Sequence, residues 1–144
     1  MRAHEQDENM EQENKEQLER NKRLVRDFYR RVFDGQNPDA VRDFVTEDYR
    51  QHCDHIPNGL SGLEDFVRTI FPDGPIPEPE EMRISPAFIV AEGDMVVIAA
   101  HLPQPEPDGS GRMYDHFVFD AFRIRDGKLS EHWSSVNKIA PPQH

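Results

Sequence analysis

An acidic residue interrupts an otherwise apolar stretch near the C-terminal end of the chain. The segment DHFVFDAFRIRDGKLSEHWSSV (115–136) is typical of two strands joined by a tight turn, with Asp120 in the first strand. An Asp126-Gly127 loop favours a type I′ hairpin and places Arg125 opposite Lys128. Continued without interruption, this register predicts that Trp133 lies directly opposite Asp120 and on the same face of the hairpin.

That face also carries Val118, Phe122 and Ile124, so we expect Asp120 to point into an apolar concavity. Desolvation disfavours a charged carboxylate, and the pKa of Asp120 is therefore predicted to rise. A carboxylic acid in such a place suits general acid/base chemistry. The alternative, which the hairpin leaves equally open, is that Asp120 bonds to a backbone amide or a histidine and closes a polar network.

Two histidines fall near the same predicted face. A symmetric turn at Asp108-Gly109 places His101 opposite His116, with both side chains beside Asp120. A slip of one residue would move His101 to the other face of the sheet. The alternatives are a half-buried position at a strand end for His101 and a position on the pocket rim for His116.

The stretch His52-Cys53-Asp54-His55 contains residue types that bind metals. It consists of turn-forming sequence without a third partner at a fixed spacing, so we predict no metal site. Cys53 lacks a general base at a fixed spacing and is not predicted to be a nucleophile. Glu131 shares the predicted face of Asp120 but lies nearer the turn, where we expect it to be solvated or paired with an arginine.

Helices are predicted to come first in the chain. Apolar residues recur with a helical period in residues 14–34 and in segments that begin at Asn37 and Ser61. Gly35 is expected to end the first helix, and Asn37 to cap the second. Ser61 is expected to cap the third, with Glu64 completing a capping box.

From residue 82 the period changes to two, and the segments 82–103 and 113–136 each predict a pair of strands. Helices followed by a four-strand antiparallel meander belong to the α+β class. We expect the N-terminal helices to pack on a curved antiparallel sheet and to leave a cone-shaped pocket. Residues 14–138 are predicted to form this domain, between a disordered arm (1–13), poor in large apolar residues, and a flexible tail (139–144).

Composition narrows the expected partners. The formal net charge of −11 argues against binding to nucleic acid or to anionic membranes. The sequence contains no apolar run of membrane-spanning length and no apolar signal-peptide core. With Cys53 as the single cysteine, an internal disulfide is excluded, and we expect a cytoplasmic location.

Several stretches together resemble the SnoaL-like polyketide cyclase family, which belongs to the nuclear-transport-factor-two-like superfamily of cone folds. They are NKRLVRDFYRRVF, DYRQH, GLSGLEDFV, AEGDMVVIAAH and DAFRIRDGKLSEHW. The resemblance implies that Asp120 handles protons during an intramolecular aldol closure, without metal or cofactor, and that His52 lies near the pocket mouth. Two departures stand out, because relatives commonly have Asp where this chain has Ser134 and Gln where it has Asn137.

The sequence thus predicts a cofactor-independent enzyme for a small apolar carbonyl compound, acting by aldol-type cyclisation or isomerisation. Asp120 would move the proton, and His52 or His101 would hold the enolate oxygen. Trp133, Phe122 and Tyr49 would shape the pocket. The alternatives are a non-catalytic ligand-binding or dimerisation module on the same fold and, less favoured, hydrolysis through an activated water.

A homodimer is also predicted. Phe117 and Phe119 fall on a strand face that is otherwise polar, and exposed aromatic residues of this kind often mark interfaces. The alternative is that the N-terminal arm or the C-terminal tail covers them.

Overall fold

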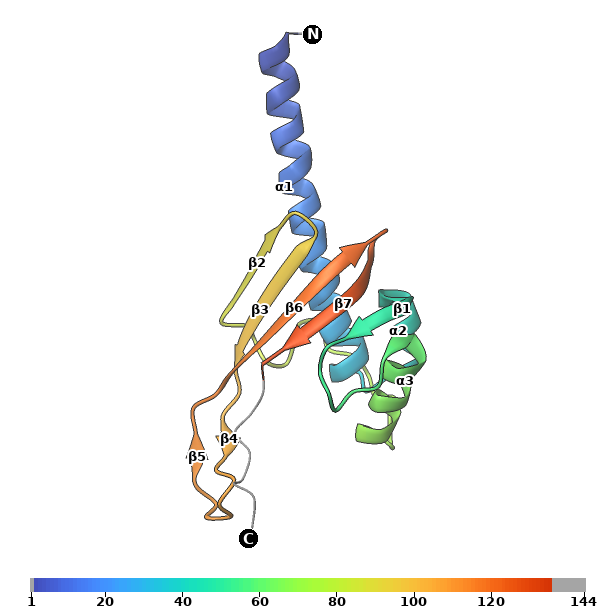
Figure 1. Ribbon diagram of the computed structural model, residues 1–144, viewed down its shortest axis with the longest axis vertical. Coiled ribbons are helices and arrows are strands. Elements are labelled where there is room, and N and C mark those ends of the chain that lie inside the picture. The colour runs from blue at the N-terminus through green and yellow to red at the C-terminus, as the bar shows by residue number, and fades with distance from the viewer. Residues whose placement is uncertain (1, 136–144) are drawn as a thin grey trace.

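A five-stranded sheet forms one layer of the protein, and helices cover one of its faces (Figure 1). The computed structural model describes residues 2–135. The helices are α1 (Ala3–Phe28), a π-helical segment η1 (Tyr29–Asp34), a 3₁₀ turn η2 (Pro38–Ala40), α2 (Val41–Phe44) and α3 (Gly59–Ile70). The strands are β1 (Val45–Gln51), β2 (Phe88–Glu92), β3 (Met95–His101), β4 (Gln104–Pro105), β5 (Met113–Tyr114), β6 (Phe117–Arg125) and β7 (Lys128–Ser134).

The order of strands in the main sheet is β1-β7-β6-β3-β2. Its last four strands in the sequence form the predicted antiparallel meander, which confirms the α+β class. The sequence missed that β1 joins the edge of this meander, where it pairs in parallel with β7. The sheet is therefore mixed, and β1 places the loop after Gln51 beside the last strand. The short strands β4 and β5 extend the connection between β3 and β6 away from the body (Figure 1).

The core lies between the helices and the inner face of the sheet. The C-terminal part of α1 crosses β2 and β3, while α3 packs against β1. Val25, Phe28 and Val32 lie one or more turns apart and are nearly inaccessible to solvent. They meet Phe122 and Leu129 of the sheet, as the predicted helical stripe requires.

The first helix ends in an irregular turn that shapes the pocket. Its regular hydrogen bonding changes to the π type over Tyr29–Asp34, a form often found at functional sites. The predicted cap Gly35 follows directly and keeps a negative φ, so it is not needed for a left-handed conformation. A Cβ at Gly35 would lie 2.5 Å from the backbone oxygen of Arg31, and this close approach is why glycine fits.

Of the caps predicted for the second and third helices, Asn37 was confirmed and Ser61 was wrong. The Asn37 side chain accepts a hydrogen bond from the backbone N–H of Asp39 at 3.1 Å, which confirms its capping role. The prediction for Ser61 was wrong, because α3 begins at Gly59 with Asn58 at the N-cap position. The Asn58 side chain accepts a hydrogen bond from the backbone N–H of Gln51 at 2.7 Å instead of capping the helix. The Glu64 carboxylate instead forms an ion pair with the guanidinium of Arg42, with 3.1 Å between Oε2 and Nη2.

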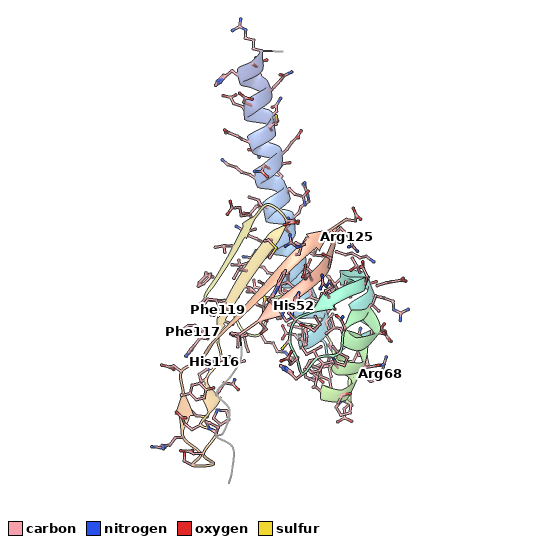
Figure 2. All side chains as sticks on the ribbon, viewed as in Figure 1. His52, Arg68, His116, Phe117, Phe119 and Arg125 are labelled. Atoms are coloured by element: carbon pink, nitrogen blue, oxygen red, sulfur yellow. The ribbon has the colours of Figure 1, made fainter. Side chains whose placement is uncertain are left out.

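The N-terminal half of α1 projects beyond the sheet (Figures 1 and 2). Every residue from Arg2 to Gln17 is exposed, and side-chain contacts such as those of His4 with Glu8 and of Gln12 with Glu16 join neighbouring turns of the helix. This half of α1 includes most of the arm (1–13) that we predicted to be disordered. Disorder of the arm in solution stays a prediction. Residues 139–144, predicted as a flexible tail, lie outside the described residues. No helix within residues 2–135 has both the length and the apolar character needed to cross a membrane.

Candidate functional site

The β6–β7 hairpin carries the central carboxylate, and its register differs from the simplest prediction. The turn itself is as predicted, with positive φ at Asp126 and Gly127 and with Arg125 paired to Lys128. Beyond Ile124 and Leu129 the pairing shifts by one residue, so that Arg123 pairs with Glu131. Ser130 is the extra residue of this β-bulge, and its hydroxyl donates to the backbone oxygen of Arg123 at 3.2 Å.

Because of the bulge, the side chains of β7 after Ser130 point to the faces opposite to those that the uninterrupted register predicts. Asp120 pairs with Ser134, whereas Trp133 pairs with Ala121 on the outer face. The prediction that Trp133 lies beside Asp120 was therefore wrong. His132, which the uninterrupted register assigned to the outer face, is buried on the inner face with Asp120.

His52 also lies on the outer face (Figure 2). Its ring stacks on Trp133 with a centroid distance of 4.9 Å, and its Nε2 is 2.6 Å from a carboxylate oxygen of Glu131. The prediction that His52 acts together with Asp120 was therefore wrong, because the two side chains lie on opposite faces of the sheet. Glu131 also pairs with Arg123 at 3.3 Å, as the expectation of an arginine partner for Glu131 required.

The β3–β6 register differs by one residue from the symmetric prediction. Asp120 pairs with Ile98, and His101 pairs with Phe117 instead of His116. This slip puts His101 on the outer face, where its Nε2 lies 3.0 Å from a carboxylate oxygen of Asp115. His116 stays on the inner face near the sheet end, and its Nε2 is buried without a hydrogen-bond partner among the described residues.

Two side chains hold the carboxylate of Asp120. The hydroxyl of Tyr29 donates to Oδ2 at 2.6 Å, and Nε2 of His132 lies 2.8 Å from Oδ1. Tyr29 comes from the π-helical segment, and His132 comes from the strand beyond the bulge. The π-helical segment and the bulge in β7 therefore position Tyr29 and His132 beside Asp120.

Gln51 determines which nitrogen of His132 carries hydrogen. Oε1 of Gln51 accepts from the backbone N–H of Cys53 at 3.1 Å, which fixes the orientation of the amide. The same oxygen lies 2.6 Å from Nδ1 of His132, so Nδ1 must be a donor. Nε2 faces Oδ1 of Asp120 at 2.8 Å, so a proton must lie between these two atoms. The pair is either an imidazolium that donates to an ionised Asp120 or a neutral imidazole that accepts from a protonated Asp120.

The electrostatics of the pair favour the ionised acid. Burial acts to raise the pKa of Asp120, but the hydrogen bond and charge of His132, with the Tyr29 and Ser134 hydrogen bonds, outweigh it, so the pKa lies below its ordinary value. Our prediction of a raised pKa was therefore wrong, because it counted desolvation without the hydrogen-bond donors. Burial, with the nearby Asp120 charge, raises the pKa of Tyr29 well above its usual range, and this hydroxyl stays protonated.

Asp120 opens onto two adjoining pockets. One has a volume of about 370 Å³ and the other about 350 Å³, and Tyr29, Phe33, Leu102, Val118 and Asp120 line both. The first pocket is completed by Asp34, Phe71, Met82, Ile84, Ile98 and Ala100. The second is completed by Phe28, Tyr49, Gln51, Cys53, His55, Ile56, Leu63, Phe66, Ile70, Phe122, His132 and Ser134.

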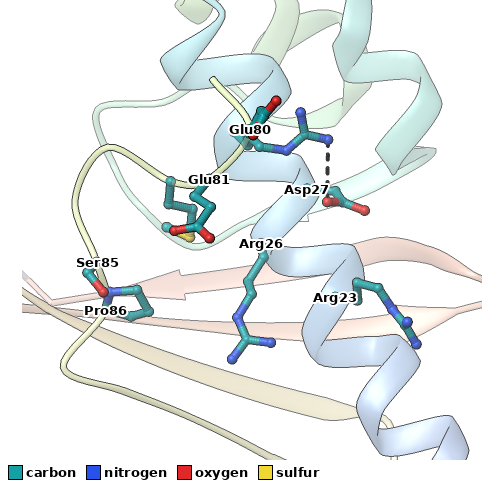
Figure 3. A pocket seen from close by; sticks show the side chains of 9 residues that line it. Arg23, Arg26, Asp27, Glu80, Glu81, Ser85 and Pro86 are labelled. Carbon is teal, nitrogen blue, oxygen red and sulfur yellow. Dashed lines mark ion pairs between the residues drawn. The ribbon is translucent and has the colours of Figure 1, made fainter. Parts of the chain in front are cut away.

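A separate cavity of about 330 Å³ lies between α1 and the connector that precedes β2 (Figure 3). Arg23, Arg26 and Arg30 line one side of it, and Asp27 forms an ion pair with Arg30 at 3.5 Å. Glu80 and Glu81 line it as well, so the charges around the cavity balance and select no charged ligand. None of the residues that hold Asp120 contributes to it.

Two of the predicted pocket residues, Tyr49 and Phe122, do line the second pocket and are almost fully buried. Sequence reasoning missed Tyr29, His132 and Gln51. Tyr29 falls within the helical stripe predicted for residues 14–34, where a buried hydroxyl signals a need for a polar partner. His132 had no such signal, because its face depends on the bulge.

Within residues 2–135, no group of three His, Cys, Asp or Glu side chains is arranged to hold a metal ion. The Sγ of Cys53 lies 3.3 Å from Nδ1 of His55, and burial raises the pKa of the Cys53 thiol. A protonated thiol is a weak nucleophile.

Comparisons with known proteins agree with this architecture. The SnoaL-like domain family matches residues 25–132. A comparison with curated protein sequences found no match.

Among solved structures, the fold is similar to a candidate SnoaL-like polyketide cyclase from Jannaschia, with 22% identity, a TM-score of 0.57 and coverage of 81% of this chain and 86% of that one. A candidate polyketide cyclase from Acidithiobacillus ferrooxidans has 17% identity, the same TM-score and coverage of 81% and 87%. An epoxide hydrolase of the LEH-like type from M. tuberculosis has 15% identity, a TM-score of 0.56 and coverage of 82% and 83%. At these identities the likeness concerns the fold.

Proposed function

Because the chain belongs to the SnoaL-like family, we propose that it is a cofactor-independent acid/base enzyme for a small apolar carbonyl compound. The observation that carries the proposal is the Asp120 carboxylate, which lines both apolar pockets and is held by Tyr29 and His132. The reaction class is aldol-type cyclisation or isomerisation, which begins with removal of a proton next to the carbonyl.

The proposed mechanism follows from the charges around Asp120. The ionised carboxylate takes a proton from the carbon next to the substrate carbonyl and becomes a neutral acid. His132, which bears hydrogen on Nδ1 because of Gln51, then stands as a cation beside the new enolate. Since the side chains of His132 and Asp120 are only 9% and 15% exposed, this attraction is stronger than it would be in water. The proton returns from Asp120 to carbon when the rearranged product forms.

Exchange of carbon-bound hydrogen tests this step without knowledge of the natural substrate. Wild-type protein in deuterated buffer should speed the loss of the α-CH₂ proton signal of 1-phenylpropan-2-one, followed by NMR. Asp120→Asn should abolish the acceleration while leaving the circular dichroism spectrum intact. His132→Gln should lower it by about 10²-fold or more, the usual scale for a positioned acid/base group.

His52→Gln is the matched control, because His52 lies on the outer face of the sheet. It should keep the exchange rate within about twofold of wild type. Equal exchange rates for wild type and Asp120→Asn would remove Asp120 from the mechanism.

A second candidate function is non-catalytic binding of the same class of small apolar ligand. The saturation of Asp120 by Tyr29 and His132 favours it, because a fully bonded carboxylate can serve as a fixed polar anchor. Tight binding of ketones without any acceleration of exchange would support this function over catalysis.

A homodimer through the outer face of the sheet is also proposed. Phe88, Val90, Phe117 and Phe119 are each between 44% and 52% exposed there. Charges beside them are paired within the chain, because Arg123 forms ion pairs with Asp94 at 3.1 Å and with Glu131 at 3.3 Å, and this pairing reduces repulsion between two copies on this face. Light scattering should give the mass of a dimer for wild type and of a monomer for Phe119→Glu; a monomeric wild type at micromolar concentration would refute the dimer.

Three expectations about the cell stay predictions. The net charge of −11 supports the absence of nucleic-acid and anionic-membrane partners, and the single Cys53 supports a cytoplasmic location. Retention of the labelled protein in the soluble, nucleic-acid-free fraction of lysed cells would be the corresponding measurement.

A further inference from the structure

The two pockets beside Asp120 lie on opposite sides of its strand. Ile98 and Ala100 of β3 line only the first pocket, whereas Tyr49 and Gln51 of β1 line only the second. Because β6 stands between β3 and the β7–β1 edge in the sheet, the pockets form one groove that runs across the strands. Asp120 lies at the middle of this groove, where both pockets share it.

Both ends of the groove are apolar. Ile98, Ala100, Met82 and Ile84 line the first end, and Leu63 and Phe66 are among the residues that line the second. The ionisable Asp34 of the first end already accepts a hydrogen bond from the backbone N–H of Arg83 at 3.0 Å.

The polar groups of the second end are largely bonded to one another. Oε1 of Gln51 serves both the Cys53 amide and the His132 ring. In the part of the chain that the structure describes, no Lys or Arg lines either pocket. His132 lines the second pocket but already faces the carboxylate of Asp120 at 2.8 Å. A carboxylate or phosphate on the ligand would thus lose its hydration without gaining an unpaired counter-charge, and it would lie beside the Asp120 carboxylate.

We infer that one ligand spans both pockets and that it is an uncharged ketone whose carbonyl is internal, with an apolar group on each side. An internal carbonyl in an unbranched ligand lets both apolar ends be filled while the carbon next to it lies against Asp120. An unbranched methyl ketone would leave one pocket empty. The inference rests on the proposed function for the identity of the reacting group, and on the groove alone for the shape of the ligand.

Two commercial ketones test the shape directly. Deoxybenzoin carries a phenyl group on each side of its carbonyl and α-carbon, and acetophenone lacks the second phenyl group. Burial of one further phenyl group is expected to tighten binding by about 10- to 100-fold. Calorimetric titration of wild type and of Asp120→Asn, which keeps the shape of the site, should both give this difference. Equal affinities for the two ketones would overturn the inference.

Filling each pocket separately tests whether one molecule spans them. Ala100→Phe fills the first pocket, and Ile56→Trp, in a loop, fills the second. Each should weaken deoxybenzoin by about tenfold or more and change acetophenone by no more than about threefold, since acetophenone needs one pocket only. Val90→Phe, on the exposed outer face, is the matched control and should change neither. Ala100→Leu replaces Ala100→Phe if the larger side chain prevents folding.

The outcomes separate this inference from the proposed catalysis. Weakening of deoxybenzoin by only one of the two filling variants would place the ligand in a single pocket and overturn the inference. Tight spanning binding without hydrogen exchange of 1-phenylpropan-2-one would support the ligand shape and refute the catalysis. Hydrogen exchange of 1-phenylpropan-2-one with no preference for deoxybenzoin would support the catalysis and overturn the inferred ligand shape.

Discussion

The hydrogen bond from Tyr29 to Asp120 should make a measurable contribution to stability. Tyr29→Phe removes only the hydroxyl that donates to Oδ2 at 2.6 Å and keeps the ring that packs against Phe28 and Phe122. A hydrogen bond to a charged group contributes about 1.5–3 kcal/mol. The side chain of Asp120 is only 15% exposed, so water replaces the lost donor poorly. We expect Tyr29→Phe to lower the free energy of unfolding by about 2 kcal/mol at pH 7.

Urea denaturation of four proteins isolates the pair. They are wild type, Tyr29→Phe, Asp120→Asn and the double variant, with unfolding followed by circular dichroism. In the Asp120→Asn background the bond is no longer charge-assisted, and the cost of removing the hydroxyl should fall to about 1 kcal/mol. Tyr49→Phe is the control for loss of another buried hydroxyl, and its cost should be the same in both backgrounds.

The pH dependence has a definite sign. The pKa of Asp120 is depressed in the folded protein, so its contribution to stability is fully present above the unfolded value of about 3.9 and is lost as pH falls through the folded value. The cost of Tyr29→Phe should therefore be largest at neutral pH and shrink below about pH 4. An equal cost in the wild-type and Asp120→Asn backgrounds, at every pH, would refute the charge-assisted bond.

Three further perturbations address the elements that position the site. Deletion of Ser130 removes the extra residue of the bulge and leaves Glu131 opposite Arg123 and His132 opposite Phe122, so His132 should stay on the inner face. Thermal denaturation should therefore remain cooperative, and loss of cooperative folding would contradict the assignment of Ser130 as the extra residue. Gly35→Ala sets a Cβ against the Arg31 carbonyl and should cost about 1–3 kcal/mol in urea; no change would contradict the close approach. Removal of residues 2–13, which are exposed throughout, should change stability by less than about 0.5 kcal/mol, and the amides of this stretch should exchange fastest with deuterium.

The sequence by itself determined most of the architecture. The helical stripe of the first helix, the Asn37 cap, the Asp126-Gly127 turn and the meander of four strands follow from local rules of periodicity and turn chemistry. These rules act over a few residues, and each was readable without knowledge of distant neighbours. The importance of Asp120 was equally local, since an acid in an apolar strand must be either functional or well bonded.

Only the tertiary structure decided which residues accompany Asp120. One extra residue in β7 reverses the direction of every later side chain relative to an uninterrupted strand, and β7 contains no Gly or Pro that would mark the bulge. The same one-residue sensitivity moved His101 to the outer face of β3. Tyr29 approaches from 91 positions earlier in the chain, and Gln51 from a strand that pairs in parallel with β7. Such contacts depend on how whole elements pack, whereas the rules that predicted the elements depend on neighbours in sequence.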